Sequence, residues 1–241
     1  NILSLGLFLG LIIALRPVNI LIFIFIGLFY RKSIGSFIKN TKPKLKIRTL
    51  FLLLLPAILL VIPQLAYNQY LSGTLFYYSY ENESFTNWNQ PKILQLWFST
   101  NNGLFTYNPV LLLAVIGTVV MIYRKEKSGW IILFFFLFIT YVFSSWWSWW
   151  YGCSYGSRIY VEYLVFLSIP LGYSFELILK MKNKTLRTMV YFIILVLCFY
   201  NLQLIYKYPK CWFWGNWDWD ILYQLFIGKN LFSEGFNLYL I

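Results

Sequence analysis

The sequence predicts an all-α protein: a polytopic bundle of transmembrane helices with aromatic-rich extracytoplasmic loops. Of the 241 residues, 60% are hydrophobic and 22% are aromatic. Only 12% are charged, whereas a soluble domain carries about 25% charged residues. Apolar runs long enough to cross about 30 Å of hydrocarbon recur along the chain. Together these features exclude an ordinary globular domain, a disordered chain and a coiled coil.

Six apolar segments are candidates for membrane spans. The first, residues 2–30, is interrupted by Arg16-Pro17. This predicts one kinked helix or two short ones, because proline lacks an amide hydrogen and clashes with the preceding turn. The other five lie near residues 49–67, 104–123, 130–146, 159–179 and 188–206. We therefore expect a transmembrane domain over residues 1–206 and an extracytoplasmic or interfacial aromatic tail over residues 207–241.

The start of the chain lacks the features of a secretory leader. Asn1 leads directly into an apolar run, without the basic n-region of a signal peptide. We expect the sequence to be the C-terminal part of a longer membrane domain.

The distribution of basic residues predicts the orientation. Fourteen of the 20 Lys and Arg residues fall in three short loops, 31–48, 124–127 and 180–187. These loops share one side if the five later spans alternate, and only five basic residues lie on the other side. Because cytoplasmic loops are enriched in Lys and Arg, we expect a multi-pass inner-membrane protein whose segments 68–108, 147–158 and 207–241 are outside. These outer segments also hold five of the eight acidic residues.

Composition narrows the possible chemistry. The net charge is +12, but the basic residues cluster in interhelical loops, so we expect no nucleic acid partner. The chain has no His, the commonest metal ligand and general base. Its three cysteines show no CxxC spacing. We therefore assign no metal-site residue and no cofactor to this chain.

The segment from Trp146 to Arg158, WWSWWYGCSYGSR, is the most unusual part of the chain. An interfacial aromatic belt accounts for its tryptophans, since Trp and Tyr favour the headgroup level. It does not account for Gly152 and Gly156, which permit positive φ or close backbone approach. Nor does it account for Arg158 at the mouth of a span, followed at i+4 by Glu162. An ionisable pair there is expected to face the protein interior or a wet cavity.

This segment resembles the bacterial membrane glycosyltransferases of the GT-C superfamily, which are related to the dolichyl-phosphate-mannose protein mannosyltransferases. Members often carry a late Trp-x-x-Trp-x-Gly-Gly-x-Ser-Phe-Gly-x-Arg segment. Here Cys153 stands at the second glycine and Tyr155 at the phenylalanine. A second element, Leu5-Gly6 through Ala14-Leu15-Arg16-Pro17, is similar to a Gly-rich short helix ending in a basic residue in these enzymes.

The resemblance implies a polyprenyl-phosphate-linked sugar donor and a glycan, lipid or protein acceptor on the outer face. It implies a catalytic carboxylate in a first outer loop upstream of Asn1, so no catalytic residue is predicted within this chain. Carried over by position, Arg158 and Arg16 contact the donor phosphate. The predicted substrate groove comprises Trp149, Tyr155, Gly156 and Glu162.

Simpler roles remain open for these arginines. Arg158 also fits an interfacial anchor or a partner of Glu162. Arg16 also fits a side chain that snorkels from a helix end to the membrane surface.

Two further outer segments have alternative readings. In 68–108, residues 91–98 predict a short interfacial helix with Pro at its start, and Asn102-Gly103 predicts a turn. The loop is then either a groove wall or an ordinary solvated loop. In the tail, the alternation of Trp and Asp over 212–220 predicts a sugar-binding surface or a wet interfacial segment. Asp218 and Asp220 would share a face on a strand but diverge on a helix.

The predicted function is transfer of a hexose or pentose from a lipid-linked donor, in cell-envelope glycan or glycoprotein synthesis. A transporter or flippase of lipid-linked sugars is the alternative, and a non-catalytic membrane subunit is a third possibility. A transporter predicts internal repeats and charges near mid-membrane on facing helices. No convincing repeat is visible, and the later spans carry few charges, which favours the enzyme.

Overall fold

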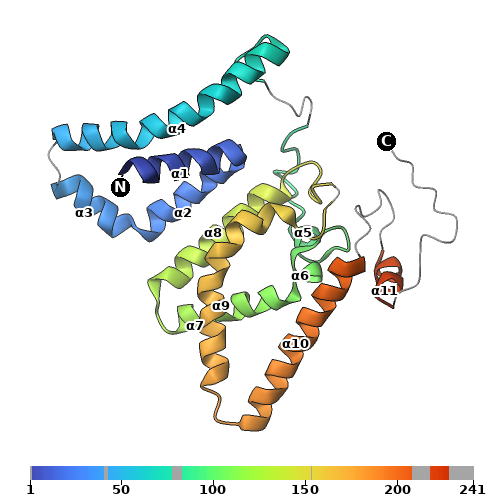
Figure 1. Cartoon of the computed structure of the whole chain (residues 1–241). Coiled ribbons are helices and arrows are strands. Elements are labelled where there is room, and N and C mark those ends of the chain that lie inside the picture. Colours follow the sequence, from blue (N-terminus) through green and yellow to red (C-terminus); the bar gives the residue numbers. More distant parts are fainter. Residues whose placement is uncertain (1, 41–42, 78–82, 153, 208–217, 228–241) are drawn as a thin grey trace. The chain divides into compact units, whose positions relative to one another are not determined.

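The computed structural model describes residues 2–40, 43–77, 83–152, 154–207 and 218–227. Over these residues the chain is helical and contains no strand, which confirms the all-α prediction. The chain divides into two compact units, Asn1–Ser84 and Phe85–Ile241 (Figure 1).

In the first unit, helix α1 (Ile2–Leu15) packs lengthwise on helix α4 (Pro43–Ser72). A Cβ atom on Gly6 would lie 2.2 Å from the Leu53 carbonyl oxygen, and one on Gly10 would lie 2.6 Å from the Ala57 Cα. These glycines allow the two backbones to approach closely, as small residues do between membrane helices. Since the contacts advance together along both helices, α1 and α4 run parallel.

The opening apolar stretch forms two helices and not one kinked helix. Helix α1 ends at Leu15, and a 3₁₀ turn, η1 (Pro17–Ile20), leads into α2 (Leu21–Phe29). Arg16 has extended backbone angles, φ −153° and ψ 119°, as favoured before a proline. The Asn19 side chain donates a hydrogen bond to the Ile12 carbonyl oxygen at 3.2 Å, which satisfies one of the acceptors that a helix end leaves open.

The basic segment predicted as a loop over 31–48 is largely helical. Residues 31–40 form helix α3 (Arg31–Asn40), and α4 already begins at Pro43. Helix α4 extends to Ser72 and contains the predicted span 49–67.

The second unit contains the remaining elements. In order they are α5 (Ile93–Phe98), α6 (Leu104–Tyr107), η2 (Pro109–Leu111), α7 (Leu112–Tyr123), α8 (Lys127–Ser144), η3 (Arg158–Tyr163), α9 (Leu164–Leu179), α10 (Lys184–Lys207) and α11 (Trp219–Ile227). Helix α5 lies within the short helix predicted over 91–98. The predicted spans near 130–146 and 188–206 correspond to α8 and α10.

The expected single span near 104–123 is divided. Helix α6 stops at Tyr107, and Asn108 leaves the helical region with φ −129° and ψ 64°. The reason is Pro109, since a proline disfavours α-helical angles in the residue before it. The span near 159–179 is continuous but begins as the 3₁₀ helix η3 before α9.

Helices α7 and α9 form the closest pair in the second unit. A Cβ atom on Gly117 would lie 1.7 Å from the Pro170 carbonyl oxygen. One turn further on, the buried Ser174 hydroxyl donates to the Leu113 carbonyl oxygen at 2.5 Å. The two backbones are therefore in direct contact, and only glycine fits at position 117.

Four described helical segments are long and apolar enough to cross a membrane: Lys46–Ser72, Lys127–Ser144, Arg158–Leu179 and Lys184–Lys207. A fifth arises if Val18–Phe29 and Arg31–Phe37, which are bent by 77°, count as one span. Ile2–Leu15 and Pro109–Tyr123 are shorter apolar helices. The length and composition of these helices fit a membrane protein.

Candidate functional site

The candidate site is built on the segment 145–157, which we call the aromatic loop, between α8 and η3. The last carbonyl groups of α8 need partners outside the helix, and the segment before α5 supplies them. The Lys92 amide donates to the Ser144 oxygen and the Asn87 amide to the Ser145 oxygen, each at 3.0 Å. The Asn87 side chain adds a bond to the Trp146 oxygen at 2.9 Å. These bonds fix the N-terminal end of the aromatic loop.

A second contact comes from the predicted turn at Asn102-Gly103, which the structure confirms. Asn102 has φ +61°, a left-handed conformation that asparagine tolerates better than most residues. Its side-chain nitrogen donates to the Trp150 oxygen at 2.9 Å and to the Gly152 oxygen at 2.8 Å. Asn102 is only 4% exposed. This part of 68–108 is therefore packed protein and not a solvated loop.

Both glycines of the aromatic loop need the conformational freedom that the sequence predicted. Gly152 has φ +68° and Gly156 has φ +62°. A Cβ atom on Gly152 would meet open space, whereas one on Gly156 would lie 3.1 Å from the Tyr107 Cβ. Gly156 is thus constrained twice, by its backbone angle and by close packing.

Helix α10 holds the far end of the loop through Asn201. The Asn201 side chain donates to the Tyr107 carbonyl oxygen and, at 2.9 Å, to the Asn108 side-chain oxygen. In return the Tyr155 hydroxyl donates to the Asn201 carbonyl oxygen at 3.1 Å. We call these four residues, together with Gly156, the Asn201 latch. No sequence signal singled out Asn108 or Asn201.

Tyr155, predicted to line a substrate groove, is a structural member of this latch. Its ring packs edge-on against Tyr107, with centroids 5.3 Å apart. Burial, and to a smaller extent Tyr200, raise the pKa of the Tyr155 phenol above its ordinary value. The hydroxyl therefore stays protonated and remains a hydrogen-bond donor at neutral pH.

Arg158 follows immediately and begins η3. Its amide donates to the Gly156 oxygen at 2.9 Å, which fixes its backbone to the turn. Its side chain is exposed and makes no hydrogen bond or ion pair with any other residue that the structure describes. The suggested pair with Glu162 does not form. The i+4 argument assumed an α-helix, whereas residues four apart on a 3₁₀ helix of three residues per turn point about 120° apart.

The other predicted groove residues lie close by along the chain. Trp149 is partly buried and packs edge-on against Trp150, with centroids 5.5 Å apart. Glu162 is also partly buried, in η3. Arg16 is exposed at the break between α1 and α2 of the first unit.

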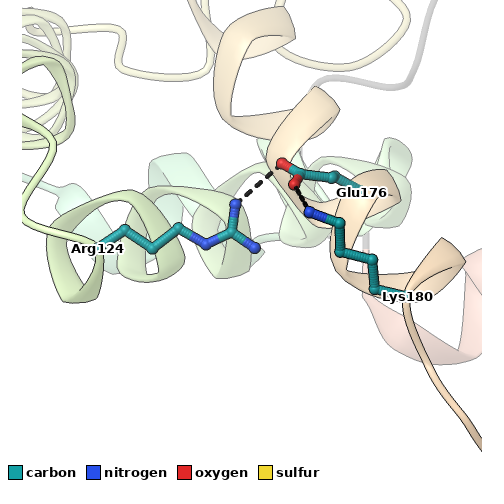
Figure 2. Close-up of polar contacts among 3 residues, drawn as sticks. All are labelled: Arg124, Glu176 and Lys180. Carbon is teal, nitrogen blue, oxygen red and sulfur yellow. Dashed lines mark hydrogen bonds and ion pairs between the residues drawn. The ribbon is translucent and has the colours of Figure 1, made fainter.

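At the other end of α7 and α9 lies a cluster of charges (Figure 2). Arg124 donates to one Glu176 carboxylate oxygen at 2.9 Å, and Lys180 donates to the other. The Arg124 guanidinium also lies 5.7 Å from the Tyr173 ring centroid. The basic loops 124–127 and 180–187 therefore lie at the same end of these helices, as the alternation of spans requires. Sequence reasoning missed this cluster, because only the i,i+4 pair Glu176–Lys180 is visible in it.

Beyond Lys207 the tail is described only over 218–227, so residues 212–217 of the Trp and Asp segment lie outside the described part. Asp218 precedes α11, and its carboxylate accepts a bond from the Ile221 amide at 2.9 Å, as an N-cap does. Asp220 lies in the first turn of the helix. The two acids therefore do not share a strand face. Among the described residues, no group of three Cys, Asp or Glu residues is placed to hold a metal ion.

No protein-family model, curated protein or solved structure matches the chain.

Proposed function

We propose that this chain is part of a multi-pass inner-membrane glycosyltransferase, which transfers a sugar from a polyprenyl-phosphate-linked donor to an acceptor on the extracytoplasmic face. The observation that carries the proposal is the exposed Arg158 guanidinium at the end of a rigidly held glycine turn, at the start of the candidate span Arg158–Leu179. A guanidinium whose backbone is fixed at the start of a candidate span is suited to a lipid-linked phosphate.

The chemistry of arginine supports this assignment. Guanidinium stays charged at any physiological pH and binds phosphate through two parallel hydrogen bonds. In the proposed transfer, the bond from the anomeric carbon to the phosphate oxygen breaks and a bond to an acceptor oxygen forms. The leaving phosphate gains negative charge, which Arg158 stabilises. A carboxylate base takes the acceptor proton, and no residue of this chain is assigned to that role.

The surroundings of Arg158 favour a role beyond anchoring. An interfacial anchor needs only a charge near the headgroups. The turn before Arg158 is instead held from two other parts of the unit, by the Asn102 side chain and by the Asn201 backbone carbonyl, which accepts from Tyr155. Such support orders the Arg158 backbone before a ligand arrives, which lowers the entropy cost of binding. Trp149, which is partly buried in the same aromatic loop, offers a flat ring of the kind that packs against a sugar.

Arg16 is the second proposed phosphate contact. Helix α1 runs parallel to α4, so Arg16 follows the end of α1 that points the same way as the C-terminus of α4. If loop 31–48 is cytoplasmic, this end of α1 points outward.

The position of the charges supports a transferase over a transporter. A transporter needs charged groups near mid-membrane on facing helices. In the candidate span Arg158–Leu179, the charged residues are Arg158 and Glu162 at one end and Glu176 at the other. The middle of this span is free of charge.

The test is donor-dependent turnover by the full-length protein in nanodiscs. We expect Arg158→Ala to weaken use of the lipid-linked donor by at least about tenfold, because a charge-assisted bond contributes about 1.5–3 kcal/mol and about 1.4 kcal/mol is tenfold. Arg158→Lys keeps the charge but loses the planar fork, so it should fall between alanine and wild type.

Arg48→Ala is the matched control, since Arg48 is also exposed but lies on the predicted cytoplasmic side. It should keep wild-type donor kinetics. Wild-type donor kinetics in Arg158→Ala would show that Arg158 serves only as an interfacial anchor. Movement of the lipid-linked sugar from one leaflet of a vesicle membrane to the other, without any sugar transfer, would favour the flippase.

A further inference from the structure

Helix α3 departs sharply from the direction of the helix before it (Figure 1). The segments Val18–Phe29 and Arg31–Phe37 are bent by 77° about the single residue Tyr30. Tyr30 takes part in the backbone hydrogen bonds of both helices: its amide donates to the Ile26 oxygen, and its oxygen accepts from the Ile34 amide, each at 2.9 Å. The two helices therefore meet at this one residue, without a longer loop between them.

Helix α3 has two chemically different sides. Ile34 and Phe37 are three residues apart and share one side, and they are 38% and 47% exposed. Lys32 and Lys39 are seven residues apart, which is nearly two turns at 3.6 residues per turn. They therefore share another side, about half a turn away from Ile34 and Phe37. The apolar side chains are large, exposed and opposite the lysines.

The charge around α3 is of one sign. Residues 31–48 contain seven Lys and Arg residues and no Asp or Glu. A short helix with an apolar side and a cationic side is typical of segments that lie in the membrane interface. Basic segments next to a span are attracted to anionic lipids of the cytoplasmic leaflet, the side predicted for this segment.

We propose that α3 is an interfacial helix that docks on anionic phospholipid headgroups of the cytoplasmic leaflet. Ile34 and Phe37 enter the upper acyl region, and Arg31, Lys32 and Lys39 contact the lipid phosphates. The bend at Tyr30 turns the chain from the direction of α2 into the plane of the membrane. The proposal is independent of sugar transfer, because it concerns the first unit and a predicted cytoplasmic surface.

The test places single spin labels on the full chain in nanodiscs, after replacement of the three native cysteines by serine. Labels at Ile34→Cys and Phe37→Cys should be reached by oxygen, which dissolves in the acyl region. A label at Ser36→Cys should be reached instead by a water-soluble nickel reagent. This contrast should be larger in nanodiscs of phosphatidylcholine mixed with phosphatidylglycerol than in phosphatidylcholine alone.

Charge variants test the lipid specificity. The triple variant Arg31→Gln, Lys32→Gln and Lys39→Gln should lose the effect of phosphatidylglycerol. The matched triple Lys125→Gln, Lys182→Gln and Lys184→Gln removes the same charge from the other basic loops and should keep it. Equal access of the nickel reagent to the labels at positions 34, 36 and 37 would overturn the proposal. The proposal would also be wrong if neither oxygen nor the nickel reagent reached the labels at positions 34 and 37. It would be wrong too if the triple variant of Arg31, Lys32 and Lys39 kept the effect of phosphatidylglycerol.

Discussion

The side-chain nitrogen of Asn201 lies 2.9 Å from the side-chain oxygen of Asn108, which is 93 residues earlier in the chain. Asn108 precedes α7, and Asn201 lies in the last two turns of α10. The same Asn201 amide group also binds the Tyr107 carbonyl oxygen. One side chain of α10 thus holds both the residue that ends α6 and the residue that interrupts the expected span.

Replacing Asn201 by alanine should destabilise the second unit. Two acceptors, on Tyr107 and Asn108, would lose their donor, and an unsatisfied buried polar group costs about 1–3 kcal/mol. Thermal unfolding of the purified protein in detergent measures the loss. Gln203→Ala is the control, since Gln203 lies on the same helix and makes no side-chain hydrogen bond with the described residues. An equal loss of stability in both variants would show that the side-chain hydrogen bonds of Asn201 add nothing to stability.

The two glycines of the aromatic loop should differ in their response to alanine. Both have positive φ, which costs a non-glycine residue roughly 1–2 kcal/mol. Gly156→Ala adds a contact of 3.1 Å with the Tyr107 side chain, whereas Gly152→Ala adds a methyl group in open space. We expect Gly156→Ala to lower the unfolding temperature and donor-dependent turnover more than Gly152→Ala. Equal effects would mean that only the backbone angle matters.

A methyl group between α7 and α9 should also be poorly tolerated. In Gly117→Ala the new Cβ would lie 1.7 Å from the Pro170 oxygen, so the helices must separate. Gly172→Ala, within α9, meets nothing within 4 Å and should be neutral or stabilising, because alanine favours a helix over glycine by about 1 kcal/mol. Thermal unfolding of both variants checks the difference, and a stable Gly117→Ala protein would contradict the observed packing.

The acids of α11 should matter for local structure and little for turnover. Asp218→Ala removes the N-cap and should cost about 0.5–2 kcal/mol, whereas Asp218→Asn keeps a capping oxygen. Hydrogen exchange of the α11 amides should rise in the alanine variant alone. Turnover of the full-length protein should stay close to wild type in both, and also in Asp220→Asn. A large loss of turnover with normal protein abundance would place these acids in the active site.

Cysteine labelling in intact cells tests the orientation, on a background without the native cysteines. Lys125→Cys and Lys184→Cys should react with a membrane-impermeant reagent only after the cells are opened. Trp88→Cys should react from outside, since Trp88 is exposed and lies on the predicted outer side. The excess of Lys and Arg in the three basic loops predicts that they are cytoplasmic. Labelling of Lys125→Cys in intact cells would therefore contradict the predicted orientation.

Local and compositional properties were predictable from the sequence alone. The helical class and the four long apolar helical segments followed from runs of apolar residues. The break at Arg16-Pro17 followed from the missing amide hydrogen of proline. The turn at Asn102-Gly103, and the positive φ of Gly152 and Gly156, reflect preferences of single residues. Each of these depends on residues within one or two helical turns, so each leaves a signal in a short stretch of sequence.

Relations between distant segments were decided only by the tertiary structure. Nothing in the sequence links Asn201 to Asn108, Asn102 to Trp150 or Arg124 to Glu176, because many polar residues had suitable chemistry and only packing brings these pairs together. The same holds for Arg158 and Glu162. Their spacing fits a shared α-helical face, but the segment is a 3₁₀ helix and the pair does not form. A short motif shows which side chains can form hydrogen bonds or ion pairs. Their actual partners depend on how helices far apart in the chain pack together.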